Sequence, residues 1–134
     1  RWMRQTAGSG GDRPVDRPDA EPSRMTVEHR QGLGGNDEGL TFDITTASDG
    51  RRILRFDCFY KNPHYHIGTS GEDAVHKMKD EGIADPVSWS LEQLKTRFSA
   101  MVTEAGYGAL ADGIDQTAVA DRLTALDAEI RAKY

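Results

Sequence analysis

The chain has a single cysteine, Cys58, no long hydrophobic run and no excess of basic residues. A lone cysteine cannot form an internal disulfide, so the composition favours a reducing cytoplasm over a secreted scaffold held by disulfides. No apolar run approaches the roughly 18 residues of a membrane helix, and the first residues lack the apolar core of a signal peptide. We therefore expect a cytoplasmic protein with no membrane partner.

The charge balance is acidic, with 17 Lys and Arg residues against 22 Asp and Glu residues, a net charge of −5 and a pI near 5.3. Binding to nucleic acid or to an anionic membrane needs a concentrated basic surface, and the sequence shows none. We therefore expect no nucleic-acid partner. The length of 134 residues is that of one ordinary domain with a core of its own.

The composition changes near Met25. Residues 1–24 are rich in Gly, Pro, Arg and Asp and poor in apolar residues, so they bury too little surface to offset the entropy of ordering and are predicted to be disordered. Residues 25–134 are predicted to form a single α+β domain. Its parts are a sheet over residues 25–67, a loop or short helix over 68–84, and a helical hairpin over 85–134.

The first part of this domain has the patterns of strands. Leu40–Thr46 alternates apolar and polar residues without a fault, which is typical of a half-buried strand. Asp49-Gly50 is a favoured tight-turn dipeptide and predicts an antiparallel hairpin with the next segment. The result is an antiparallel meander of about four strands, with the fourth at an edge: Met25–Arg30, Leu40–Thr46, Arg52–Phe59 and His64–Ile67.

The second part has helical periodicity. Asp85-Pro86 is typical of a helix start, apolar residues then recur at helical spacing, and Gly106 ends the run. A second helix is predicted over Asp115–Lys133, and the short connection between the two favours antiparallel helices packed on one face of the sheet. A short helix is also predicted at Ala74–Met78.

The alternation assigns side chains to the two faces of the sheet. Cys58 shares the phase of the apolar residues that face the helices, whereas Thr41, Asp43, Arg55 and Asp57 point to the open face. If Tyr65 and Ile67 point inward, His64 and His66 join Arg55 and Asp57 on the open face. These four residues, Arg55, Asp57, His64 and His66, are the predicted ligand or partner surface.

Two imidazoles one residue apart on a strand can meet one metal ion, and Asp57 is the candidate third ligand or the carboxylate that fixes a histidine tautomer. His29 is a weaker fourth candidate, because it shares the inward phase of Val27. Cys58 is expected to be a buried, structural residue. A His-x-His pair on an edge strand is also typical of solvated side chains.

Three motifs carry a resemblance: the Gly35–Gly39 turn, Arg55–Phe59 and Pro63–His66, followed by a helix carrying Trp89. Together they resemble a family of small bacterial proteins known as a domain of unknown function. The resemblance covers about Met25 to Gly106. It implies a bacterial, cytoplasmic protein with a domain boundary near Met25, and it supplies no activity, cofactor or catalytic residue.

Two functions remain open on the sequence. The favoured one is a small binding or interaction module that meets a protein partner, or a second copy of itself, through the open sheet face or the edge strand. The alternative is a metal-binding protein or metal-dependent enzyme that uses His64, His66 and Asp57 with a divalent transition metal. A concave pocket around the histidines favours the alternative, whereas a flat, semi-apolar surface favours the module.

Overall fold

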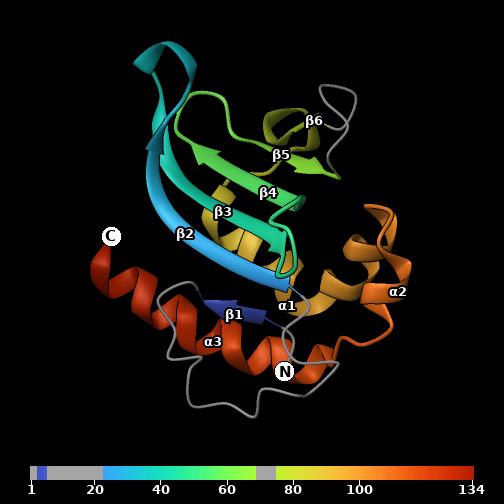
Figure 1. Cartoon of the computed structure of the whole chain (residues 1–134). Helices are drawn as coiled ribbons and strands as arrows, with labels where there is room; N and C mark the ends of the chain where they lie inside the picture. Colours follow the sequence, from blue (N-terminus) through green and yellow to red (C-terminus); the bar gives the residue numbers. More distant parts are fainter. Residues whose placement is uncertain (1–2, 6–22, 69–74) are drawn as a thin grey trace.

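The computed structural model describes residues 3–5, 23–68 and 75–134. In this part of the chain one sheet has six strands in sequential order (Figure 1). β1 pairs with β2 in parallel, and every other neighbouring pair is antiparallel. The predicted α+β class and the four-stranded meander are confirmed. The strands are β1 (Met3–Gln5), β2 (Ser23–Gln31), β3 (Glu38–Thr46), β4 (Arg52–Phe59), β5 (His64–Ile67) and β6 (Val75–Lys77).

Both ends of the sheet differ from the prediction. β1 lies within the N-terminal segment predicted to be disordered, and β2 begins at Ser23 rather than at Met25. The rest of that segment, residues 1–2 and 6–22, lies outside the described residues.

The predicted short helix at Ala74–Met78 is wrong, although Ala74 itself is not described. Val75–Lys77 forms β6 and pairs with β5. The prediction that β5 lies at the edge of the sheet is therefore wrong. The backbone groups of β5 need partners on both sides, and stacking of His76 on Tyr65, with ring centroids 4.7 Å apart, supports this pairing. A 3₁₀ turn follows at Met78–Glu81 and buries Met78.

Three helices follow the sheet: α1 (Pro86–Glu104), α2 (Gly108–Ala111) and α3 (Gln116–Lys133). Asp85 caps α1 by accepting the amide of Ser88, and Asp115 caps α3 in the same way. Gly106, with a φ of 98°, follows the end of α1 in the left-handed conformation that ends many helices. No helix in the described part of the chain is both long and apolar enough to cross a membrane.

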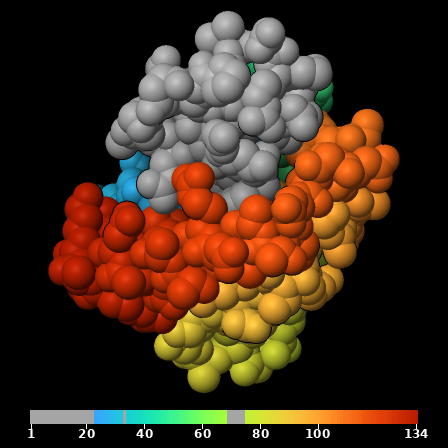
Figure 2. All heavy atoms as spheres, turned by 90° about the horizontal axis from the view of Figure 1, so that it is seen from below, coloured from blue at the N-terminus to red at the C-terminus, as the bar shows by residue number. Residues whose placement is uncertain are grey.

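The two long helices are antiparallel, as predicted. Near its start, α1 meets the end of α3, where Arg131 donates to the Ser88 hydroxyl. Towards its end, α1 meets the start of α3, where the side chain of Gln116 accepts the amide of Ser99. Seen from below, α3 forms an outer surface of the helical layer, beside α1 and α2 (Figure 2).

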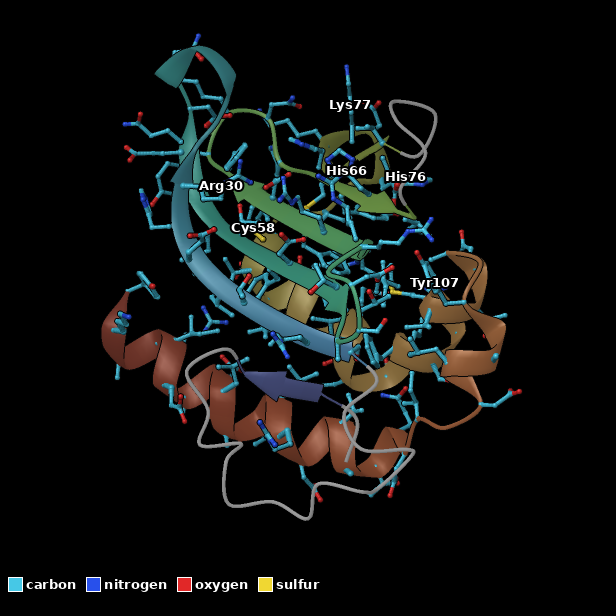
Figure 3. All side chains as sticks on the ribbon, viewed as in Figure 1. Arg30, Cys58, His66, His76, Lys77 and Tyr107 are labelled. Carbon is cyan, nitrogen blue, oxygen red and sulfur yellow. The ribbon has the colours of Figure 1, made fainter. Side chains whose placement is uncertain are left out.

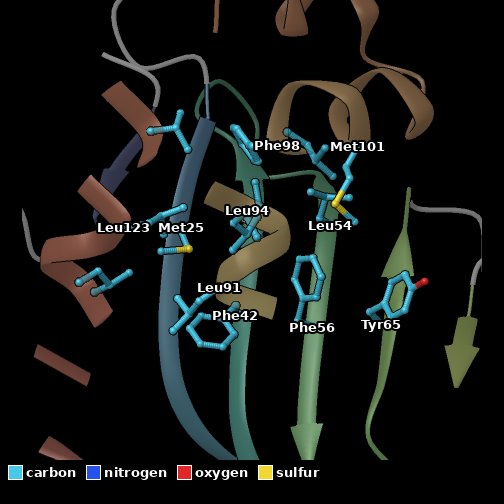
Figure 4. Packing of buried hydrophobic residues seen from close by; sticks show 14 of the residues in the cluster. Met25, Phe42, Leu54, Phe56, Tyr65, Leu91, Leu94, Phe98, Met101 and Leu123 are labelled. Carbon is cyan, nitrogen blue, oxygen red and sulfur yellow. The ribbon is translucent and has the colours of Figure 1, made fainter. Parts of the chain in front are cut away.

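The core lies between this helical layer and one face of the sheet (Figure 4). Phe42 and Phe56 from the sheet and Leu94 and Phe98 from α1 have no exposed surface, and Leu123 joins them from α3. The strand side chains that the alternation places inward are all buried: Leu40, Phe42, Ile44, Leu54, Phe56, Cys58 and Tyr65. Among the described residues, no helix covers the opposite face of the sheet.

One irregularity in the sheet changes the direction of a side chain. Ile44 pairs with Leu54, but the next residue, Thr45, pairs with Arg52, so Ile53 is an extra residue in β4. This is a β-bulge, in which the extra residue breaks the alternation of faces. Ile53 is fully buried, and Arg52 lies opposite Thr45, which is on the open face.

Candidate metal centre

The candidate metal centre lies on the open face, where β4 and β5 pair. Asp57 lies directly opposite His64, and Arg55 lies opposite His66. The Nε2 atoms of His64 and His66 lie 3.2 and 3.5 Å from the same atom, Oδ2 of Asp57. The register thus brings the three predicted metal ligands together, and one ligating atom from each lies within 4.8 Å of the others.

These distances match those between neighbouring ligands of one metal ion. Two ligand atoms that each bind the metal at about 2.0–2.1 Å lie about 2.8–3.4 Å apart when the ligand–metal–ligand angle is between a right angle and the tetrahedral angle. Of the two distances from Asp57 to the histidines, that to His64, 3.2 Å, lies within this range, and that to His66, 3.5 Å, lies just above it. The ligating atoms of all three side chains lie within 4.8 Å of one another, so some of them move closer together when the three share one ion.

A hydrogen bond to the backbone defines the tautomer of His64. Its Nδ1 lies 2.9 Å from the carbonyl oxygen of Asn62. A carbonyl can only accept, so Nδ1 carries a proton, and in the neutral ring Nε2 therefore presents its lone pair to the carboxylate of Asp57. Two acceptors facing each other repel, so either a second proton or a cation lies between them.

Asp57 is held in place through its other oxygen. Oδ1 accepts the hydroxyl of Thr41 at 2.7 Å and Nη1 of Arg30 at 3.3 Å, which leaves Oδ2 directed at the histidines. The residue is only 3 % exposed. Burial by itself raises the pKa of Asp57. Hydrogen bonds from His64, His66 and Thr41 lower the pKa by more than burial raises it, so the net pKa of Asp57 is far below its usual value. Asp57 is therefore anionic and ready to bind a cation.

The charge of Asp57 also acts on His64. The hydrogen bond to Asp57 raises the pKa of His64, burial opposes this shift, and the bond to the Asn62 carbonyl adds to it. Protonated His64 thus forms an ion pair with Asp57 in a mostly buried position, and the raised pKa keeps this pair intact to a higher pH.

Arg55, predicted to lie on the open face, pairs with Asp43. Its Nη2 donates to Oδ2 of Asp43 at 2.9 Å. Asp57 pairs instead with Arg30, which is labelled in Figure 3. The sequence analysis missed Arg30 and Arg52 as members of the site. Arg30 shares its phase with the outward residues of β2 and was open to prediction, whereas Arg52 depends on the bulge.

The site lies in a cavity of about 670 Å³ on the open face. Its rim is the loop between β2 and β3, which meets the turn between β4 and β5. Asp37 joins the two by accepting the backbone amides of Glu38, Lys61 and Asn62 at 2.8–2.9 Å. Phe59 lines the cavity beside His64, with its ring edge-on and the centroids 5.7 Å apart.

A family model, described as Domain of unknown function (DUF7700), matches residues 18–130. The chain belongs to this family. The predicted membership in a family of unknown function is confirmed, and the match extends beyond the segment on which the resemblance rested. No curated protein and no solved structure matches the chain.

Two other residues with side chains that can bind a metal, Cys58 and His29, lie away from the candidate metal centre. Cys58 is buried on the helix side of the sheet, as predicted, with its Sγ 3.5 Å from the hydroxyl of Ser90. Burial raises the pKa of Cys58 to about 12, so the thiol is not a ready metal ligand. His29 has the predicted phase but is exposed, with 42 % of its side chain accessible, and it lies 3.5 Å from Glu38.

Proposed function

We propose that this protein binds one divalent transition-metal ion through His64, His66 and Asp57. The observation that carries the proposal is the 2.9 Å contact between Nδ1 of His64 and the Asn62 carbonyl. Because Nδ1 donates to this carbonyl, Nε2 is the nitrogen that meets Asp57: it donates to the carboxylate when the ring is protonated and offers its lone pair to a metal ion when the ring is neutral.

A proton on each Nε2 is the competing explanation. Both Nε2 atoms converge on one oxygen, and the two rings lie 5.1 Å apart. Protons satisfy these contacts when His64 is an imidazolium and His66 donates from a neutral ring, whereas a single metal ion binds both nitrogens and the carboxylate together. The ligand set of two nitrogens and one oxygen suits zinc, iron, cobalt or nickel better than calcium or magnesium.

Three protein ligands leave coordination positions for water or a substrate, and the cavity lies beside them. When bound, such an ion polarises an oxygen atom of the ligand or lowers the pKa of a bound water. The protein's own residues orient the site: Thr41 and Arg30 fix Asp57, and the Asn62 carbonyl fixes His64.

This geometry bears on the choice between the two functions. An interaction module needs a flat, semi-apolar surface, whereas the face around the histidines is concave and lined by charged and polar side chains. Binding of a protein partner or self-association through the sheet stays a prediction.

The test uses cobalt, whose absorption reports on its ligands. Protein stripped with a chelator is titrated with Co(II), and we expect one ion per chain with visible absorption of a nitrogen- and oxygen-ligated centre. His66→Ala should abolish saturation in the same range. His29→Ala removes an imidazole outside the site and should bind as the unmodified protein does. Binding that is absent, or equal in the His66 variant, contradicts the proposal.

A further inference from the structure

Arg52 reaches the metal cavity only because of the bulge at Ile53. Unbroken alternation from Asp57 and Arg55 would place residue 53 on the open face and Arg52 among the helices. The extra residue reverses this, burying Ile53 and turning Arg52 into the lining of the cavity. Bulges of this kind redirect side chains beside binding and catalytic sites.

The charges of the cavity leave Arg52 uncompensated. Arg30 is paired with Asp57, and Arg55 with Asp43. The third acid, Asp37, accepts backbone amides at the rim. Three arginines line the cavity, and Arg52 is the one whose side chain makes no hydrogen bond or ion pair with the described residues.

Two further features concern the arginines of the cavity. Burial lowers the pKa of Arg52, and the neighbouring charge of Arg55 lowers it further, against the weaker attraction of Asp43 and Asp57. The Nε atom of Arg55 is buried without a hydrogen-bond partner in the described part of the chain, as is Oδ1 of Asp43. A divalent ion at the histidines adds two more positive charges to the same cavity.

We propose that the cavity binds a small organic oxyanion, with Arg52 as its anchor and the metal ion as its second contact. This inference rests on the proposed function for the second contact alone. The guanidinium presents two parallel donors that match a carboxylate or a phosphoryl group. A cavity of about 670 Å³ is of the size that small-molecule sites have. The protein as a whole is acidic and repels anions, so anion binding is expected at this local site and not over the rest of the surface.

The experiment compares two probes that share one body and differ in their head group. Benzoate and phenylphosphonate are titrated calorimetrically into the metal-free and the cobalt-loaded protein, with neutral benzamide as the control ligand. Arg52→Gln removes the anchor, and Arg52→Lys keeps the charge without the paired donors. Arg51→Gln is the matched control, because Arg51 is the exposed neighbour outside the cavity.

We expect one of the two anions to bind and benzamide not to bind. Arg52→Gln should weaken that binding by at least about tenfold, Arg52→Lys by less, and Arg51→Gln by less than about twofold. The probe that binds with the higher affinity shows whether the site prefers a carboxylate or a phosphoryl group. Thermal unfolding of each variant checks that the fold is kept.

The outcomes separate this inference from the proposed function. If cobalt does not bind, the proposed function fails, and the role of Arg52 is decided by the titration of the metal-free protein. If cobalt binds but neither anion does, or if the Arg51 and Arg52 variants lose affinity equally, the anchor is refuted and the metal site stands.

Discussion

Saturation with zinc should raise the thermal unfolding temperature of this protein by an amount that depends on His66. A ligand present at 100 times its dissociation constant stabilises the folded state by about 2.7 kcal/mol. For a domain of this size, each kcal/mol corresponds to a shift of about 3–5 °C. We therefore expect an increase of about 8–14 °C when free zinc is held at 100 times the dissociation constant.

His66→Ala is the informative perturbation, because His66 is directed at Asp57, whereas His64 also bonds the Asn62 carbonyl and packs against Phe59. Changes in residues that merely orient a metal ligand cost 10–100-fold in affinity, so loss of a ligand costs at least about 100-fold. At the same free zinc concentration the stabilisation then falls to about 0.4 kcal/mol, a shift of about 1–2 °C.

Differential scanning calorimetry with a zinc buffer measures both shifts. His29→Ala serves as the control, because His29 lies outside the centre and is exposed. It should keep the full shift. If His66→Ala shifts as much as the unmodified protein, or if His29→Ala loses the shift, zinc binds elsewhere and the assigned ligand set is wrong.

Three further predictions test the surroundings of the site. The pKa of His64 is raised, chiefly by its hydrogen bond to Asp57, so in the metal-free protein its contribution to stability is complete below about pH 6.5 and is lost as the pH rises through the folded value. Zinc should reverse this trend in urea unfolding, because it binds the unprotonated imidazole, and a parallel trend with and without zinc contradicts the assignment. Thr41→Val removes the hydroxyl donor to Oδ1 of Asp57 at nearly constant volume and should cost about 1–3 kcal/mol in urea unfolding, and no loss would show that this bond is dispensable. Cys58 is buried and burial raises its pKa to about 12, so a thiol reagent should label it only in denaturant, and rapid labelling of the folded protein would place the thiol at the surface.

Local patterns predicted most of the fold. The alternation in Leu40–Thr46 needs no knowledge of the rest of the chain, and it located a strand and its buried face. The capping residues Asp85 and Asp115 fixed the starts of both long helices in the same way. The closeness of Asp57 to the two histidines followed from the same alternation, because adjacent strands in register bring their outward side chains together.

The missed features depend on contacts between distant segments. β6 is a strand because β5 and the ring of Tyr65 lie beside it, and its three residues carry no strand pattern of their own. Arg30 reaches Asp57, 27 residues away, across β3, where the residue opposite Arg30 is Gly39, which has no side chain. The bulge did leave a trace in the sequence, since Ile53 and Leu54 are adjacent apolar residues where strict alternation allows one.

The strand β4 has consequences for how such a protein is redesigned. Phe56 is buried among the helices, while its neighbour Asp57 faces the histidines across the thickness of one backbone. Side chains at positions 57, 64 and 66 are thus exchangeable without repacking the hydrophobic layer. If the proposed metal and anion sites are correct, the open face is a scaffold on which selectivity for a different ion, or for a different anion through Arg52, is engineered one side chain at a time.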